Sequence, residues 1–194
     1  MSARDRLQDA IFRAWSTFYD SALFQRPFFR RVHEAVLQTA APDARRVLDL
    51  GCGTAQLTVD LAARHPFVAG ADLSPEMLRA AKRRLGASAP PLVCANVYAL
   101  PFADGAFDLL TSTISYHWYA DKPRALAEIR RVLAPGGHLL LATITETRIK
   151  LGPPKLVRFT DIRETERDLA AAGFTVAARR RVRPFVTIFD ARKL

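Results

Sequence analysis

Cysteine and long apolar runs are both scarce in this sequence. Its 194 residues include two cysteines, Cys52 and Cys94, too few for a disulfide framework and too isolated for a metal site. No apolar run approaches the roughly 18 residues needed to span a bilayer. The charges near the start leave no apolar core for a signal peptide. We therefore expect a cytoplasmic protein with no transmembrane segment, and we assign no metal ligands.

The basic excess is unevenly distributed along the chain. The net charge is +10, and residues 1–46, 47–145 and 146–194 contribute +3, +1 and +6. The central part is nearly neutral, so the excess lies on its flanks. Such a bias favours anionic partners in general but says nothing about the fold. Because 24 of the basic residues are arginine, a biased base composition of the coding sequence explains the excess equally well.

Strand and helix patterns alternate regularly through the middle of the chain. Apolar residues at helical spacing predict two helices before the first strand. Strands are then expected at residues 45–50, 67–72, 92–95, 107–113 and 138–145, and helices at residues 55–64, 75–85 and 123–133. Ser74 followed by Pro75 is a good helix start, and Pro135-Gly136-Gly137 predicts a turn. This alternation indicates a parallel sheet with helices on both faces.

The end of the chain breaks the alternation. A helix fits residues 161–172, and two strands fit residues 174–182 and 185–190. The few residues between these strands cannot form a parallel crossover, so the strands must be antiparallel neighbours. We therefore expect one α/β domain spanning residues 1–194, with a Rossmann-like, seven-stranded, mostly parallel sheet that ends in an antiparallel hairpin.

A glycine turn and a later carboxylate carry the first chemical signal. Gly51 and Gly53 lie between a strand and a helix, where absent side chains allow a tight turn and close approach of a ligand. Asp72 follows at the end of the next strand, where a carboxylate can accept both ribose hydroxyls. An NAD-binding protein would show the same pair, so the pair alone does not identify the ligand.

Four segments together resemble the motifs of class I S-adenosylmethionine-dependent methyltransferases. They are residues 47–55, 71–78, 96–108 and 131–139, and they cover most of residues 45–145 in the family's order. The nearest resemblance is to ubiquinone/menaquinone-biosynthesis and small-molecule methyltransferases. It implies N-terminal helices over residues 1–44, a cofactor-binding core over 45–145, a short lid loop over 146–160 and a last helix and hairpin over 161–194.

The resemblance also implies which residues bind S-adenosyl-L-methionine. The expected cofactor-binding residues are Tyr19, Asp49, Gly51, Cys52, Gly53, Asp72, Leu73, Met77, Asn96, Val97 and Ser112. Asp72 would hold the ribose, Leu73 and Met77 would cover the adenine, and Tyr19 would close over the carboxylate end. Asn96 stands where the family usually has aspartate; its amide oxygen can still accept from the adenine amino group. Ala55 replaces a frequent third glycine.

The segment after the fourth strand contains the candidates for catalysis. His117 is the candidate general base, because its ordinary pKa lies near neutrality; the alternative is that it only shapes the pocket. Tyr116, Trp118 and Arg148 are the candidate substrate-binding residues, which would suit a planar, apolar or anionic small-molecule acceptor. For Arg148 the structural alternative is a solvated charged loop, and for Tyr19 it is simple helix core.

Three functions stay open at this point. A small-molecule methyltransferase, acting on an O, N or C nucleophile by in-line displacement, explains all four segments. An NAD-dependent oxidoreductase shares the glycine turn but explains neither Pro135-Gly136-Gly137 nor the terminal hairpin. A nucleic-acid-binding or interaction protein would suit the net charge of +10, yet no aromatic–basic stacking motif is present. The sequence also lacks the Asn/Asp-Pro-Pro-Tyr/Phe motif of amino-methylating nucleic-acid enzymes.

Overall fold

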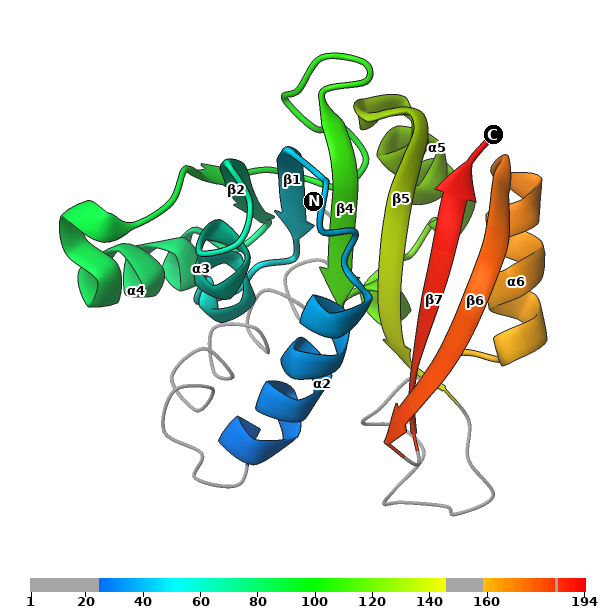
Figure 1. Ribbon diagram of the computed structural model, residues 1–194, viewed down its shortest axis with the longest axis horizontal. Helices are drawn as coiled ribbons and strands as arrows, with labels where there is room; N and C mark the ends of the chain where they lie inside the picture. The colour runs from blue at the N-terminus through cyan, green and yellow to red at the C-terminus, as the bar shows by residue number, and fades with distance from the viewer. Residues whose placement is uncertain (1–24, 146–158, 184) are drawn as a thin grey trace.

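Seven strands form one sheet at the centre of the molecule. The computed structural model describes residues 25–145, 159–183 and 185–194. The strands are β1 (Arg46–Leu50), β2 (Phe67–Asp72), β3 (Leu92–Cys94), β4 (Phe107–Thr113), β5 (Leu133–Ile144), β6 (Phe174–Arg183) and β7 (Val186–Lys193). Their order is β3-β2-β1-β4-β5-β7-β6, and β7 is antiparallel to both β5 and β6. This confirms the predicted mostly parallel sheet with a terminal antiparallel hairpin (Figure 1).

Helices cover both faces of the sheet. They are α2 (Gln25–Thr39), α3 (Gln56–Ala62), α4 (Pro75–Leu85), α5 (Lys122–Val132) and α6 (Ile162–Ala171), with short 3-10 helices η1 (Gly86–Ser88) and η2 (Tyr116–Trp118). Ser74, Asp121 and Asp161 cap α4, α5 and α6, each accepting from the backbone N–H three residues later. These caps satisfy N–H groups that have no partner inside the helix.

The core has two parts, one on each face of the sheet. On one face, buried residues of β1, β4 and β5 pack against α2 and α3. On the other face, the strands pack against α5, α6 and η2. Alternation of side chains along β4 explains the division, since Leu109 belongs to the first cluster and Leu110 to the second. No helix within the described residues is long and apolar enough to cross a membrane.

Strand β5 starts earlier than expected, at Leu133 rather than His138. Phe107 of β4 pairs with Leu133, and Leu109 pairs with His138, so residues 134–137 form an irregularity in the ladder. The predicted Pro-Gly-Gly turn is therefore an interruption within a longer strand. The β4–β5 pairing resumes after residues 134–137, because β4 continues in the same direction.

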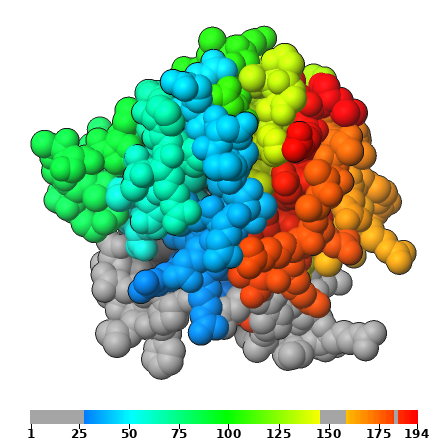
Figure 2. Space-filling model, in the orientation of Figure 1, coloured from blue at the N-terminus to red at the C-terminus, as the bar shows by residue number. Residues whose placement is uncertain are grey.

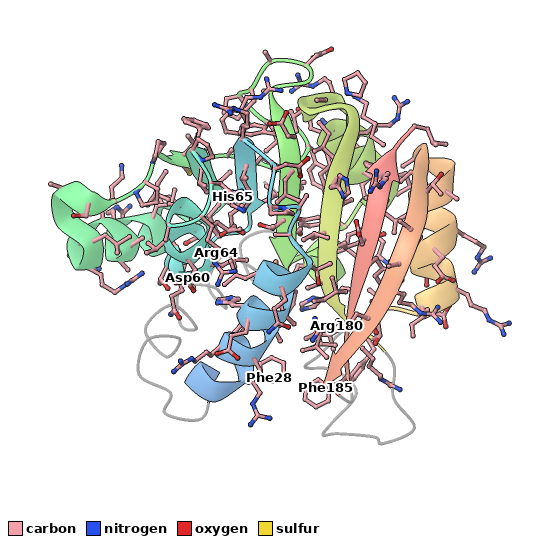
Figure 3. The ribbon with its side chains drawn as sticks, viewed as in Figure 1. Phe28, Asp60, Arg64, His65, Arg180 and Phe185 are labelled. Atoms are coloured by element: carbon pink, nitrogen blue, oxygen red, sulfur yellow. The ribbon has the colours of Figure 1, made fainter. Side chains whose placement is uncertain are left out.

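Helix α2 is held against the sheet at several points (Figure 3). The Phe28 and Phe185 rings stack with their centroids 5.5 Å apart. Arg64 donates to the Leu37 carbonyl oxygen, and Arg180 of β6 donates to the Gln38 side chain. Figure 2 shows α2 crossing the front of the molecule between α3 and β6. Residues far apart in sequence thus fix the one described N-terminal helix.

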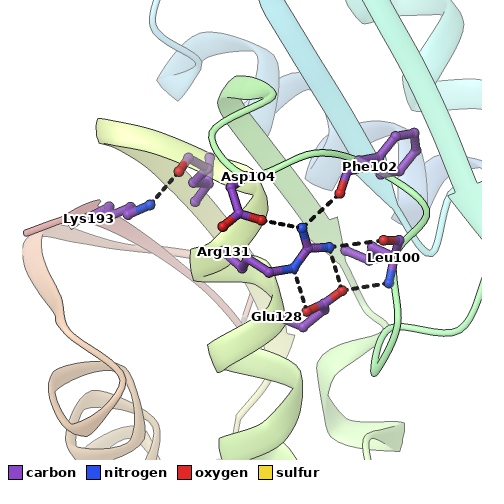
Figure 4. A network of polar contacts seen from close by, with 7 residues as sticks. Leu100, Phe102, Asp104, Glu128, Arg131 and Lys193 are labelled. Carbon is purple, nitrogen blue, oxygen red and sulfur yellow. Dashed lines mark hydrogen bonds and ion pairs between the residues drawn. The ribbon is translucent and has the colours of Figure 1, made fainter.

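Arg131 joins α5 to the segment that leads into β4 (Figure 4). Its guanidinium donates to the Glu128 and Asp104 carboxylates and to the carbonyl oxygens of Leu100 and Phe102. Glu128 in turn accepts from the Leu100 backbone N–H at 2.7 Å. The segment between β3 and β4 is therefore anchored to α5. Its beginning lies beside the end of β2.

Candidate functional site

The sheet reverses its direction of growth between β1 and β4. From β1 the chain adds β2 and β3 on one side, and then adds β4 and β5 on the other. The loops that follow the two strands at such a point leave in opposite directions. They open a crevice beyond the carboxyl ends of the strands, where α/β proteins bind ligands. Asp72 is the last residue of β2 and Ser112 the last but one of β4, so both lie at this edge; Figure 1 shows β1 and β4 running toward it.

The glycine turn wraps around the end of β2. Gly51 and Gly53 have φ values of 73° and 54°, in the left-handed region that favours glycine. The backbone N–H groups of Gly51 and Cys52 both donate to the Ala71 carbonyl oxygen, at 2.7 and 3.1 Å. Ala55, in place of a third glycine, also has a positive φ of 61°, so the turn keeps its shape with a strained residue at its end.

Asp72 ties the end of β2 to the turn and to the start of α4. Its carboxylate accepts from the backbone N–H of Gly53 and of Ser74, both at 2.8 Å. Burial raises its pKa, while backbone N–H groups of Ser74, Gly53 and Leu73 oppose that rise. A carboxylate offers about four acceptor positions. Asp72 therefore retains capacity to accept from ribose hydroxyls.

Asp49 lies behind the turn, in the core. It is 2% exposed, and its two oxygens accept from the hydroxyls of Thr58 in α3 at 2.7 Å and Thr111 in β4 at 2.9 Å. Burial raises its pKa to about 6, against the two threonine hydrogen bonds, and the nearby Asp72 raises it further. Asp49 thus joins β1, α3 and β4 directly beneath the glycine turn.

The edge beyond β2 and β3 has an apolar surface beside hydrogen-bonding groups. Leu73 is 60% exposed, whereas Met77 is buried in α4. Asn96 is exposed, and its side-chain oxygen accepts from the Tyr98 backbone N–H at 3.0 Å. Val97 is partly buried against the core. An exposed leucine next to Asp72 is the kind of surface that a nucleoside base would cover.

A cluster of three hydroxyl groups lies where β4 ends. The Ser112 and Ser115 oxygens are 2.7 Å apart, and the Tyr119 oxygen lies 3.3 Å from the first and 3.1 Å from the second. Ile114, between the two serines, has a φ of 54°, which is unusual for a β-branched residue. A Cβ on Gly51 would lie 2.7 Å from the Ser115 Cβ. The hydroxyl cluster therefore packs directly against the glycine turn.

The remaining candidates lie on η2. His117 is 4% exposed, and its ring centroid is 4.9 Å from that of Trp118. Tyr116 is fully buried; its hydroxyl donates to the Asp168 carboxylate of α6 at 3.0 Å, and its ring lies under the Lys122 ammonium. Tyr116 thus joins η2 to α6. Its role and those of His117 and Trp118 in substrate binding or catalysis stay predictions.

Two expected site residues, Tyr19 and Arg148, lie outside the described residues, as does most of the expected lid loop. The sequence did not single out Ser115, or the two threonines that bind Asp49. Ser112 still belongs to β4, whereas Ser115 and Tyr119 follow the positive φ at Ile114 and flank η2, so their side chains meet through a change of chain direction that leaves no spacing signal. The threonine contacts depend on tertiary packing and leave no local signal.

These residues fit S-adenosylmethionine. The turn exposes backbone without side chains, Asp72 has free acceptor capacity, and Leu73 offers an uncovered apolar surface. Thr113, at the end of β4, has a buried hydroxyl with no hydrogen-bond partner among the described residues. An orphaned polar atom beside the crevice is consistent with a polar ligand group there.

Comparison with known proteins identifies the family. A methyltransferase domain family model matches residues 48–141. The chain is 39% identical over 122 residues to a malonyl-[acyl-carrier protein] O-methyltransferase of Erwinia pyrifoliae, covering 62% of this chain and 46% of that protein. It is 41% identical over 116 residues to a demethylmenaquinone methyltransferase of Thermus thermophilus, covering 58% and 51%. The chain thus spans about half the length of these relatives.

The fold agrees with the sequence comparison. A crystal structure of a SAM-dependent methyltransferase from Aquifex aeolicus superposes with a TM-score of 0.71 at 23% identity, covering 84% of this chain and 89% of that one. The expected family, fold and cofactor class are therefore confirmed. The chain belongs to the class I S-adenosylmethionine-dependent methyltransferases.

Proposed function

We propose that this chain transfers the methyl group of S-adenosylmethionine to a small-molecule acceptor. The observation that carries the proposal is the joint position of the glycine turn, Asp72 and the hydroxyl cluster at the reversal point of the sheet. An NAD-binding role would also use Asp72, but it does not account for the antiparallel β7 between β5 and β6.

Different residues would bind different parts of the cofactor. Asp72 would accept hydrogen bonds from the ribose hydroxyls, and Leu73 and Met77 would cover the adenine, with Val97 also on the adenine side. The Asn96 oxygen would accept a hydrogen bond from the adenine amino group. Backbone of Gly51, Cys52 and Gly53 lies along the methionine part, with Ser112 beside it and Tyr19 at the carboxylate end. Asp49 acts through the turn, because its hydrogen bonds to two threonines hold β1, α3 and β4 together.

When bound, S-adenosylmethionine supplies a methyl group on a positively charged sulfur. The chain contributes by aligning the nucleophile with that methyl group and by excluding water. A base is needed only where the acceptor must lose a proton, and His117 is the residue that we propose for it. A His117→Ala enzyme that kept wild-type turnover with its true substrate would exclude this role.

The acceptor is a small molecule or a small group attached to a carrier. The two relatives are named for such acceptors, malonyl-[acyl-carrier protein] and demethylmenaquinone. Trp118 and Arg148 are the proposed acceptor-side residues, Trp118 for a planar or apolar part and Arg148 for an anionic part. Tyr116 is fully buried and hydrogen-bonded to Asp168, so its proposed role is to position Trp118 through η2. Replacing Arg148 by serine should raise KM for an anionic acceptor at low salt and leave kcat unchanged.

Binding and transfer experiments test the proposed function. Calorimetry should show binding of S-adenosylhomocysteine and no binding of NAD. Tritiated S-adenosylmethionine should then label a low-molecular-weight or carrier-bound fraction of cell extract. Binding of NAD alone would favour an oxidoreductase. A salt-sensitive shift of RNA mobility with no methyl transfer to any fraction would favour a nucleic-acid-binding protein that keeps the fold.

A further inference from the structure

The cofactor crevice carries uncompensated negative charge in a strongly basic protein. The net charge is +10, yet none of the ion pairs formed by the described residues includes Asp49 or Asp72. Each carboxylate is held by neutral donors, hydroxyls for Asp49 and backbone N–H groups for Asp72. Buried charges are usually paired, so this arrangement leaves a negative field directed at the glycine turn.

The hydroxyl cluster adds acceptors to the same place. Each hydroxyl has one proton to donate and can accept through its lone pairs. Three hydroxyls with three mutual contacts use all three protons within the cluster of Ser112, Ser115 and Tyr119. Only lone pairs then remain for a ligand. Because burial raises the pKa of Tyr119, with Asp72 adding to the rise, the phenol keeps its proton and the cluster stays neutral.

We propose that Asp49 and this hydroxyl cluster make the site selective for charge, so that it binds cationic S-adenosylmethionine in preference to neutral-sulfur S-adenosylhomocysteine. The inference rests on the proposed function and assigns Asp49 and Tyr119 as specificity-determining residues. Asp49 is 2% exposed, so its charge acts on the ligand from beneath the turn and not by direct contact. Such selectivity favours release of the product, because transfer of the methyl group removes the positive charge.

The test compares ligands that differ in charge at one atom. We expect wild-type protein to bind S-adenosylmethionine, and sinefungin with its amine, more tightly than S-adenosylhomocysteine in calorimetry. Asp49→Asn should lower the ratio of S-adenosylmethionine to S-adenosylhomocysteine affinity about tenfold, because one nearby charge is lost. Asparagine can still accept from one threonine hydroxyl and donate to the other, so the hydrogen bonds beneath the turn survive. Tyr119→Phe should lower the ratio about threefold by removing one acceptor.

A matched control removes a carboxylate elsewhere. Asp190 of β7 is partly buried and pairs with His138, and β7 lies three strands away from the Asp49 strand β1 in the sheet. Asp190→Asn changes the net charge as Asp49→Asn does, and it should leave the ratio within twofold of wild type. A purely structural role of Asp49 would weaken both ligands equally and would not move the ratio.

A pH titration of wild-type protein gives a second measurement that needs no variant. The groups around Asp49 are the Thr58 and Thr111 hydroxyls, the Cys52 thiol and the Asp72 carboxylate; Arg84 reaches the turn only at the Thr54 carbonyl oxygen. The pKa of Asp49 is about 6, so the affinity ratio should fall as the pH drops through about 6. In Asp49→Asn that part of the pH dependence should disappear.

The outcomes separate the inference from the function on which it rests. If wild-type protein binds neither ligand, the proposed function fails and the inference with it. If both ligands bind and the ratio of their affinities is unchanged in Asp49→Asn and Tyr119→Phe, only the charge selectivity is overturned. Where a variant does not fold, an affinity ratio of wild-type protein that does not depend on pH overturns it in the same way.

Discussion

Replacing Asp49 by asparagine should stabilise the protein at neutral pH while weakening its preference for the charged cofactor. The carboxylate is buried between β1, α3 and β4, with two threonine hydroxyls as donors. Asparagine keeps the shape and two hydrogen bonds but carries no charge to desolvate. Functional sites commonly contain such groups, whose cost to stability is offset by activity.

The magnitude follows from the pKa. Asp49 titrates at about 6 in the folded protein, against an ordinary value of 3.8, a difference of about 2 units or roughly 3 kcal/mol. The folded state therefore holds the proton more tightly than the unfolded chain does. The stability contributed by protonated Asp49 is fully present below pH 4 and is lost as the pH rises through about 6. Above pH 6 the variant should exceed wild type by up to about 3 kcal/mol.

Urea unfolding between pH 4 and 8, followed by circular dichroism, measures this difference. The two proteins should be nearly equal in stability at pH 4 and diverge up to pH 7. A variant less stable than wild type at pH 7.5, or a difference that does not depend on pH, would refute the reasoning. Either result would show that the ionised carboxylate is compensated by groups other than its two threonines.

Three further predictions concern the glycine turn, the proposed adenine surface and the Arg131 network. Gly51→Ala should destabilise the protein by about 1–2 kcal/mol more than Gly53→Ala in thermal unfolding. Both glycines have a positive φ, but of the two only Gly51 would place a Cβ against a neighbour, the Ser115 side chain at 2.7 Å. Equal losses of stability would contradict the predicted clash. N-ethylmaleimide should modify exposed Cys94, whose sulfur lies 3.6 Å from the carbonyl oxygen of Leu73, the residue proposed to cover the adenine. Bound S-adenosylhomocysteine should slow this reaction, and an unchanged rate would place the adenine elsewhere. Arg131→Ala should cost about 2–3 kcal/mol, since it removes the cation paired with partly buried Glu128 and the donor to two carbonyl oxygens. Chemical unfolding with Arg131→Lys as the comparison should show partial rescue, and full stability in the alanine variant would contradict this role.

Local chemistry in the sequence was enough to predict most of the elements. The strands at residues 67–72 and 107–113 and the helix at 75–85 have the predicted bounds, because apolar periodicity, Ser74 and Pro75 act over a few residues. The antiparallel hairpin was also predicted, since a connection of two residues permits no other pairing. The early start of β5 was not, because its pairing with Phe107 depends on a distant strand.

The site divides in the same way. The glycine turn and Asp72 were recognisable because backbone conformation and strand ends place them by sequence spacing. The partners of Asp49 were not, since Thr58 comes from α3 and Thr111 from a strand 62 residues away. Ser115 reaches Gly51 only because the chain takes a positive φ at Ile114.

The sequence by itself determined the order of elements, the hairpin and the motifs that gave the family, because each of these depends on neighbouring residues. Tertiary structure decided which groups surround those motifs: neutral donors around two carboxylates, a cluster of three hydroxyls whose Ser115 lies against Gly51, and Tyr116 in the core rather than at the surface. Burial and charge compensation depend on residues brought together from distant parts of the chain, so the electrostatic character of the site follows only from the folded protein.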